Sequence, residues 1–179
     1  MILDQTGSAF GGGVAIHNVY DVECFDRAGR LKWREVVGNL ITTEGLNDLL
    51  DKYLKGSTYT AAWYVGLIDN AGFTAIAAGD TAAQINGSNG WAELSEYDEA
   101  TREVLTLGTP AAGSVDNSAS KASFTINASK SVEGAFIASL STKDGTTGTL
   151  YGAAAFAATR VVISGDTLNV TATLTAASA

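Results

Sequence analysis

"YDVECFDRAGRLKWREVV", residues 20–37, has two segments of alternating apolar and charged residues on either side of a turn. Asp26-Arg27-Ala28-Gly29 fits a type I turn, which favours Asp at its first position and Gly at its last. Taking these four residues as the loop, the predicted cross-strand pairs are Glu23–Lys32 and Asp21–Arg34 on one face, and Val22–Trp33 and Cys24–Leu31 on the other. Opposite charges meet on the first face and apolar side chains on the second, as cross-strand pairing favours. The stretch therefore predicts a β-hairpin with one buried face.

Strand patterns continue toward the C-terminus. Residues 166–175, "DTLNVTATLT", alternate cleanly and place Leu168, Val170, Ala172 and Leu174 on one face. Residues 63–68, "WYVGLI", read as a short strand buried on both faces. Several short strands between turn residues, with one proline in the chain, predict a mainly β, antiparallel sandwich of jelly-roll type. A plain immunoglobulin-like sandwich is the alternative.

Residues 43–55 give the one convincing helix pattern. Its apolar stripe follows the i, i+3, i+4 rule and consists of Leu46, Leu49, Leu50, Tyr53 and Leu54. Thr42 or Thr43 can cap its start and Gly56 can end it. Two i,i+4 ion pairs, Asp48–Lys52 and Asp51–Lys55, are expected on the solvent-exposed face of the helix. We expect the stripe to pack against the core.

Length and composition limit the class of protein. A chain of 179 residues fits one sandwich domain (residues 39–179), preceded by a Gly-rich arm (1–13) and a hairpin extension (14–38). The single Cys24 cannot form an internal disulfide, and no zinc spacing is present. The net charge of −8 argues against nucleic-acid binding. Without a signal-peptide pattern or a membrane-span pattern, we expect a soluble protein made in a reducing cytosol.

Residues able to carry chemistry are few. His17 is the only histidine and has no nucleophile motif beside it. The acidic stretch 93–103, with five carboxylates and one cation, Arg102, is interpreted as a solvated edge or loop, with a site for a basic partner or a cation as the alternative. Asp69, Asn70 and Asp80 could contribute to a calcium site, but they lack the pattern of a calcium-binding loop. The sequence thus predicts no catalytic residue, no metal site and no cofactor.

Small residues fill the arm and the loop at 71–83, which suits close packing between copies. We expect a neighbouring chain to hold the arm, because termini are usually loose unless something ties them down. The predicted partner interface consists of Phe10, Gly11, Gly12, Gly13, Trp33, Phe73 and Ile76.

A resemblance gives these features a context. The segments "NLITTEGLNDLLDKYLKGSTYTAAWYVGLIDNAGFTAIAAGDT", "ASKASFTINAS", "STKDGTTGTLYGAAAF" and "ISGDTLNVTATLT", between Asn39 and Thr175, resemble small virion proteins of tailed bacteriophages. Among these, a small acidic sandwich with an arm is most similar to capsid decoration, or cement, proteins. The resemblance implies a homotrimer on the outer capsid surface that bridges subunits of the major capsid protein and has no enzymatic activity.

Two other functions compete with this one. A tail, baseplate or fibre-associated protein would bind host-surface glycans through loops bearing Trp91 and Tyr97. An enzyme would need a site built from residues such as His17, Glu93 and Glu96. The decoration protein is the preferred hypothesis, with a membrane or nucleic-acid partner not expected.

Overall fold

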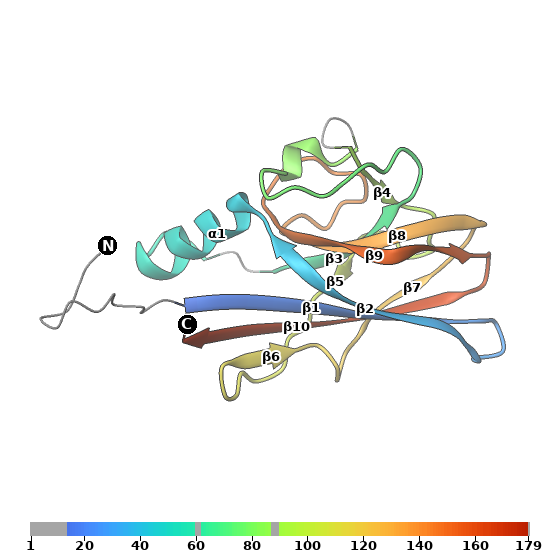
Figure 1. Ribbon diagram of the computed structural model, residues 1–179, viewed down its shortest axis with the longest axis horizontal. Coiled ribbons are helices and arrows are strands. Elements are labelled where there is room, and N and C mark those ends of the chain that lie inside the picture. The colour runs from blue at the N-terminus through green and yellow to red at the C-terminus, as the bar shows by residue number, and fades with distance from the viewer. Residues whose placement is uncertain (1–13, 60–61, 87–89, 179) are drawn as a thin grey trace, which may run out of the picture.

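The computed structural model describes residues 14–59, 62–86 and 90–178, and these residues form ten strands and one α-helix (Figure 1). The strands are β1 (Val14–Phe25), β2 (Leu31–Ile41), β3 (Tyr64–Asp69), β4 (Ala92–Leu94), β5 (Glu103–Val104), β6 (Ser114–Asp116), β7 (Ala122–Thr125), β8 (Lys130–Ala138), β9 (Leu150–Val162) and β10 (Thr167–Ser178). The helix is α1 (Thr43–Leu49), which continues as a π-helical turn, η1 (Leu50–Leu54); a short 3-10 turn is η2 (Ala82–Gln84). None of the described helices is long and apolar enough to span a membrane.

The strands follow the order β4-β3-β8-β9-β2-β1-β10-β6, with β5 added to β3 and β7 to β10, and they pair antiparallel. β2 links two layers, because its residues up to Asn39 pair with β1 whereas Leu40 and Ile41 pair with β9. Figure 1 shows β1 and β10 in the lower layer and β3, β8 and β9 above them. One core fills the space between the layers; its members include Tyr20, Val22, Cys24, Val65, Leu67, Ala135, Ile137, Phe156, Leu168, Val170 and Ala172. The predicted antiparallel β-sandwich is confirmed.

The hairpin of residues 20–37 forms, but its predicted register is wrong by two residues. Glu23 lies opposite Arg34, and Cys24 lies opposite Trp33, because a bulge follows Cys24 and leaves Lys32 as the extra residue. The loop is also longer than expected, since Asp26 N donates to Arg30 O (2.9 Å) outside the Asp26–Gly29 turn. A shift of two residues keeps Val22, Cys24 and Trp33 on the predicted apolar face, whereas Leu31, beyond the bulge, lies opposite Phe25 instead of Cys24 and is 54% accessible. The apolar face of β1 is accordingly buried.

The bulge changes the partners of the charged residues. Lys32 turns toward Asp166 and forms an ion pair with it, while Glu23 pairs with Lys121 (2.6 Å). The predicted pair of Asp21 with Arg34 is present, with Nε 2.7 Å from Oδ1. The hairpin, expected as an extension, lies within the sheet: β1 pairs with β10 along its whole length.

The helix begins and ends where predicted, but its apolar stripe does not pack against the core. Thr42 caps the start by accepting a hydrogen bond from Gly45 N (3.0 Å), and Gly56, with φ of 82°, follows the end. Only the first turn docks on the sandwich. Glu44 accepts hydrogen bonds from Leu150 N (2.7 Å) and Ala82 N (2.9 Å). The rest of α1 and all of η1 project beyond the layers (Figure 1).

A loop covers the outer face of the upper layer. Residues 70–86 and Trp91 lie over β3, β8 and β9 and contribute to a second apolar cluster, which consists of Ile68, Ala82, Ile85, Trp91, Phe136, Ala138, Leu150 and Ala153. The cover explains why β3 is buried on both faces, as predicted. The 71–83 segment, expected as an empty interface loop, thus contributes to the packing of its own chain.

Candidate functional site

An apolar groove lies at one end of the sandwich. It has a volume of about 790 Å³ and lies between the helical segment and the strand ends. We call it the end groove; its lining includes Val14, Ile16, Leu46, Leu49, Leu50, Tyr53, Leu54, Tyr59, Trp63, Leu105, Leu107, Ile137, Tyr151, Leu174 and Ala176. Apolar side chains dominate this lining, which is typical of a surface that receives an apolar partner.

The helical wall of the groove follows from the way the helix docks. Gly45 lies so close to β9 that a Cβ there would meet the Tyr151 carbonyl oxygen at 2.2 Å. This close approach holds the first turn on the sandwich, so the later turns overhang its end. Their apolar stripe remains exposed: Leu50 is 51%, Leu54 71% and Tyr53 83% accessible. Contiguous exposed apolar surface of this kind marks interaction sites in soluble proteins.

The opposite wall is the continuation of the core. The inward face of β1, which buries Tyr20 and Val22, extends outward through Ile16 to Val14 at the edge of the groove. The rings of Trp63 and Tyr151 lie 5.5 Å apart and connect the groove to the core. The groove is therefore the open end of the sandwich core rather than a separate cavity.

Charged groups are confined to two members of the lining, Asp48 and Lys52. Lys52 forms a long ion pair with Asp51 (3.9 Å), and Lys55 pairs with Asp51 at 2.9 Å as predicted. Such a lining has no cluster of acids, bases or nucleophiles of the kind that catalysis requires. The arrangement suits binding of an apolar protein segment.

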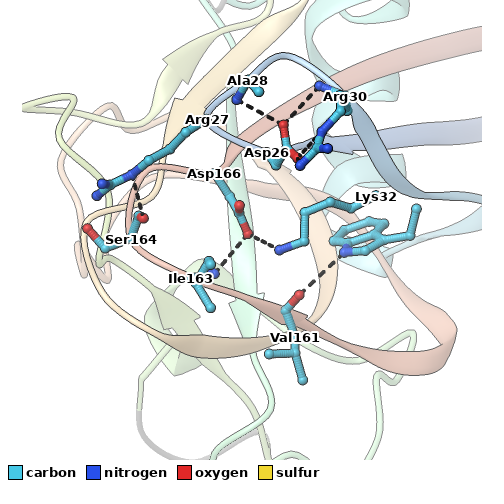
Figure 2. Close-up of polar contacts among 10 residues, drawn as sticks. Asp26, Arg27, Ala28, Arg30, Lys32, Val161, Ile163, Ser164 and Asp166 are labelled. Carbon is cyan, nitrogen blue, oxygen red and sulfur yellow. Dashed lines mark hydrogen bonds and ion pairs between the residues drawn. The ribbon is translucent and has the colours of Figure 1, made fainter.

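A second hollow, of about 430 Å³, lies between the β1–β2 loop and the β9–β10 turn. Figure 2 shows that two charged members of its lining have partners in the chain: Asp26 accepts from Ala28 N and from Arg30, and Arg27 Nε donates to Ser164 O (3.1 Å). Hydrogen bonds from Arg30 hold the pKa of Asp26 below its ordinary value. The contacts of Asp26 order the β1–β2 loop and the Arg27–Ser164 hydrogen bond joins it to the β9–β10 turn, so we assign this hollow a structural role.

The predicted interface residues do not share one site. Trp33 is half-buried against the core, with its ring 5.9 Å from that of Phe156. Phe73 and Ile76 are half-buried against the second apolar cluster. The arm residues Phe10 and 11–13 lie outside the described residues.

The residues considered for an enzyme are likewise separated by their contacts. The interpretation of 93–103 as a solvated edge or loop is wrong at four positions: Leu94 and Tyr97 are buried, and Glu93 and Arg102 form a buried ion pair. Glu96 pairs with Lys130 (2.5 Å), and His17 is exposed on β1.

The residues considered for binding glycans or calcium also have internal roles. Trp91 and Tyr97, which mark the loops considered for glycan binding, are 3% and 1% accessible. Asp69 accepts from Ala71 N and pairs with Lys130, while Asp80 accepts from Ala77 N and from Trp91 Nε1. Within 14–59, 62–86 and 90–178, no three His, Cys, Asp or Glu side chains gather where they could hold a metal ion.

Comparisons with known proteins leave the site to be interpreted from its geometry. No protein-family model matches the chain, and no curated protein is found to be similar to it.

The sequence did not predict the end groove. Its helical stripe was recognised, but a stripe of this spacing looks the same whether it meets its own core or a partner. Tyr59, Leu105 and Leu107 lie outside any periodic pattern, and only the fold brings them together with the helix.

Proposed function

We propose that this protein is a non-enzymatic structural protein of a tailed-phage virion, a decoration protein that binds the outer capsid surface. The end groove carries the proposal. A chain that leaves an apolar groove of about 790 Å³ open at one end is suited to docking on another protein. The resemblance of residues 39–175 to small phage virion proteins supports the virion as the place where that docking occurs.

The proposed partners are subunits of the major capsid protein and other copies of this chain, as a homotrimer. The net charge of −8 supports a protein partner over nucleic acid, because phosphate binding requires clustered cations. The alternative of glycan binding through Trp91 and Tyr97 loses its support, since both rings are buried.

Cryo-electron microscopy of virions that contain this chain tests the proposal. We expect density for the sandwich on the outer face of the head, repeated with the capsid lattice. Quantitative gel analysis of the same particles should give an abundance near that of the major capsid protein. Density confined to the tail, or a few copies per particle, would overturn the decoration role in favour of a tail or fibre-associated protein.

A further inference from the structure

We infer that the end groove receives the N-terminal segment, residues 1–10, of a second copy of this chain. The inference rests on the proposed function, because it names the partner that makes an assembly from single copies. It joins two features of the chain: an unfilled apolar groove and an apolar segment that begins at the groove's edge.

The groove needs an occupant. Tyr59 is 74% accessible and, with Tyr53 and Leu54, faces the hollow without cover from the described residues. An extended apolar segment or an amphipathic helix is the usual ligand of such a groove. About 790 Å³ is enough space for several large side chains.

The N-terminal segment has the composition to fill it. "MILDQTGSAF" contains Met1, Ile2, Leu3 and Phe10 and one charged side chain, Asp4. The groove lining is likewise mostly apolar, and its two charged side chains, Asp48 and Lys52, are of opposite sign. Residue 13 is bonded to Val14, which is part of the groove lining and 73% accessible, so the segment is attached to the chain at the edge of the groove. Ten extended residues span about 33 Å, so the segment is long enough to reach an adjacent copy.

The direction of β1 favours a second copy over the same chain. Val14 is paired with Ser178, so the strand keeps its course to its first described residue. In Figure 1 the N-terminal end of β1 points out past the end of the sandwich, and this direction favours an adjacent copy as the receiver. In a closed symmetric oligomer each copy then donates one segment and receives one.

Disulfide trapping tests where the segment binds. Leu3→Cys and Leu50→Cys are made in separate full-length chains of different tag size, mixed and oxidised gently; Cys24 is left in place because it is buried. We expect a mixed disulfide dimer from this pair. Leu3→Cys mixed with Ile163→Cys is the control, because Ile163 is equally exposed (50%) but lies outside the groove lining. The control should give little dimer.

The double variant Leu3→Cys/Leu50→Cys separates the two possible sources of the segment. A disulfide formed only within one chain would overturn the inference and assign the groove to the chain's own arm. Equal dimer yields from the Leu50→Cys and Ile163→Cys mixtures would overturn it as well, because the contact would then be random.

Sedimentation of the isolated protein gives a second measurement. The full chain should be an oligomer at micromolar concentration, whereas a chain starting at Val14 and the variant Leu50→Lys/Tyr53→Lys should be monomers with an unchanged circular dichroism spectrum. The matched variant Val161→Lys/Ile163→Lys changes exposed residues outside the groove and should remain an oligomer. A monomeric full chain at every concentration tested would refute the inference.

These outcomes are distinct from those of the virion experiment. An oligomer held by the arm but absent from the capsid would overturn the proposed function and leave the exchange of segments in place. Capsid density from single copies with empty grooves would support the proposed function and overturn the exchange of segments.

Discussion

The guanidinium of Arg102 and the carboxylate of Glu93 form an ion pair that is completely shielded from solvent, with Nη2 2.7 Å from Oε2. Further hydrogen bonds satisfy the same two groups. Arg102 donates to the carbonyl oxygens of Leu140 and Gly145, each at 3.0 Å, and Glu93 accepts from Asp144 N (2.7 Å). The guanidinium also lies 5.0 Å from the Phe136 ring centroid. The pair therefore fastens the β8–β9 connection to residues 93–102.

Arg102→Met should lower the free energy of unfolding by about 3–5 kcal/mol, because it leaves the buried Glu93 carboxylate and two carbonyl groups without their partner. Urea denaturation at pH 7 measures the change. Arg30→Met is the matched control: Arg30 also pairs with a carboxylate, Asp26, but its side chain is 81% accessible. Exposed pairs contribute about 1 kcal/mol or less, so the control should change little. A similar loss for both variants would contradict the assigned role of burial.

Gly45→Ala should be destabilising although it lies in a helix, where Ala is normally preferred to Gly by about 1 kcal/mol. The added Cβ would meet the Tyr151 carbonyl oxygen at 2.2 Å, so the first turn of α1 must move off β9. We expect a loss of about 1–3 kcal/mol, the usual cost of overpacking. Gly38→Ala is the control, because a Cβ at Gly38 meets nothing within 4 Å. Urea denaturation measures the free energy of unfolding of both variants. A Gly45→Ala variant more stable than the unmodified chain would show that the helix is not docked on β9 at this residue.

Much of the fold could be predicted because a strand that is buried on one face alternates apolar and polar residues along its sequence. The alternation of residues 166–175 predicted the buried face of β10, and the Asp-to-Gly turn predicted the hairpin. The register was not predicted because the hydrophobic pattern does not reveal a bulge. A charged residue such as Lys32 is compatible both with pairing opposite Glu23 and with being the extra residue of the bulge. The strand order was not predictable either, since pairs such as β1 with β10 join residues more than 140 positions apart.

The candidate site was missed for a different reason. The spacing of Leu46, Leu50 and Leu54 predicts an apolar face but not what covers it. That outcome depends on Gly45, whose lack of a side chain brings the first turn against β9 and leaves the later turns overhanging. The buried pair of Arg102 with Glu93 was similarly hidden, because a charged stretch is usually a solvated one.

Cys24 should be inert in the native protein. The thiol lies in the core, and burial, together with the nearby Asp166 carboxylate, raises its pKa to about 12. Because the thiolate is the reactive form, a thiol reagent at pH 8 should label the native protein very slowly and label it fully in urea. The variant Ile163→Cys supplies the comparison: its new thiol is exposed and should react at once, giving one label per native chain. Rapid labelling of the unmodified native chain would mean that the β1 end of the core opens.

The Asp21–Arg34 pair should make a small pH-dependent contribution to stability. Hydrogen bonding and the charge of Arg34 lower the pKa of Asp21 from its ordinary value of 3.8. A carboxyl whose pKa is lower in the folded state stabilises the fold above its unfolded pKa, and the contribution disappears as the pH falls through the folded value. Asp21→Asn should therefore cost about 0.2–1 kcal/mol at pH 7, the range for a largely exposed pair. The difference from the unmodified chain should shrink as the pH falls below 3.8 and vanish once the pH is below the folded-state pKa of Asp21.

Arg34→Met tests whether that contribution comes from the pair itself. It removes the cause of the lowered pKa and keeps the Asp21 carboxyl, so its unfolding free energy should show the same loss at pH 7 and the same convergence in acid. The double variant should lose no more than either single variant, because the interaction can be removed only once. Raising the salt concentration to about 1 M, where the screening length is about 3 Å, should reduce the difference at pH 7. Additive losses in the double variant would show that Asp21 and Arg34 stabilise the hairpin through separate contacts.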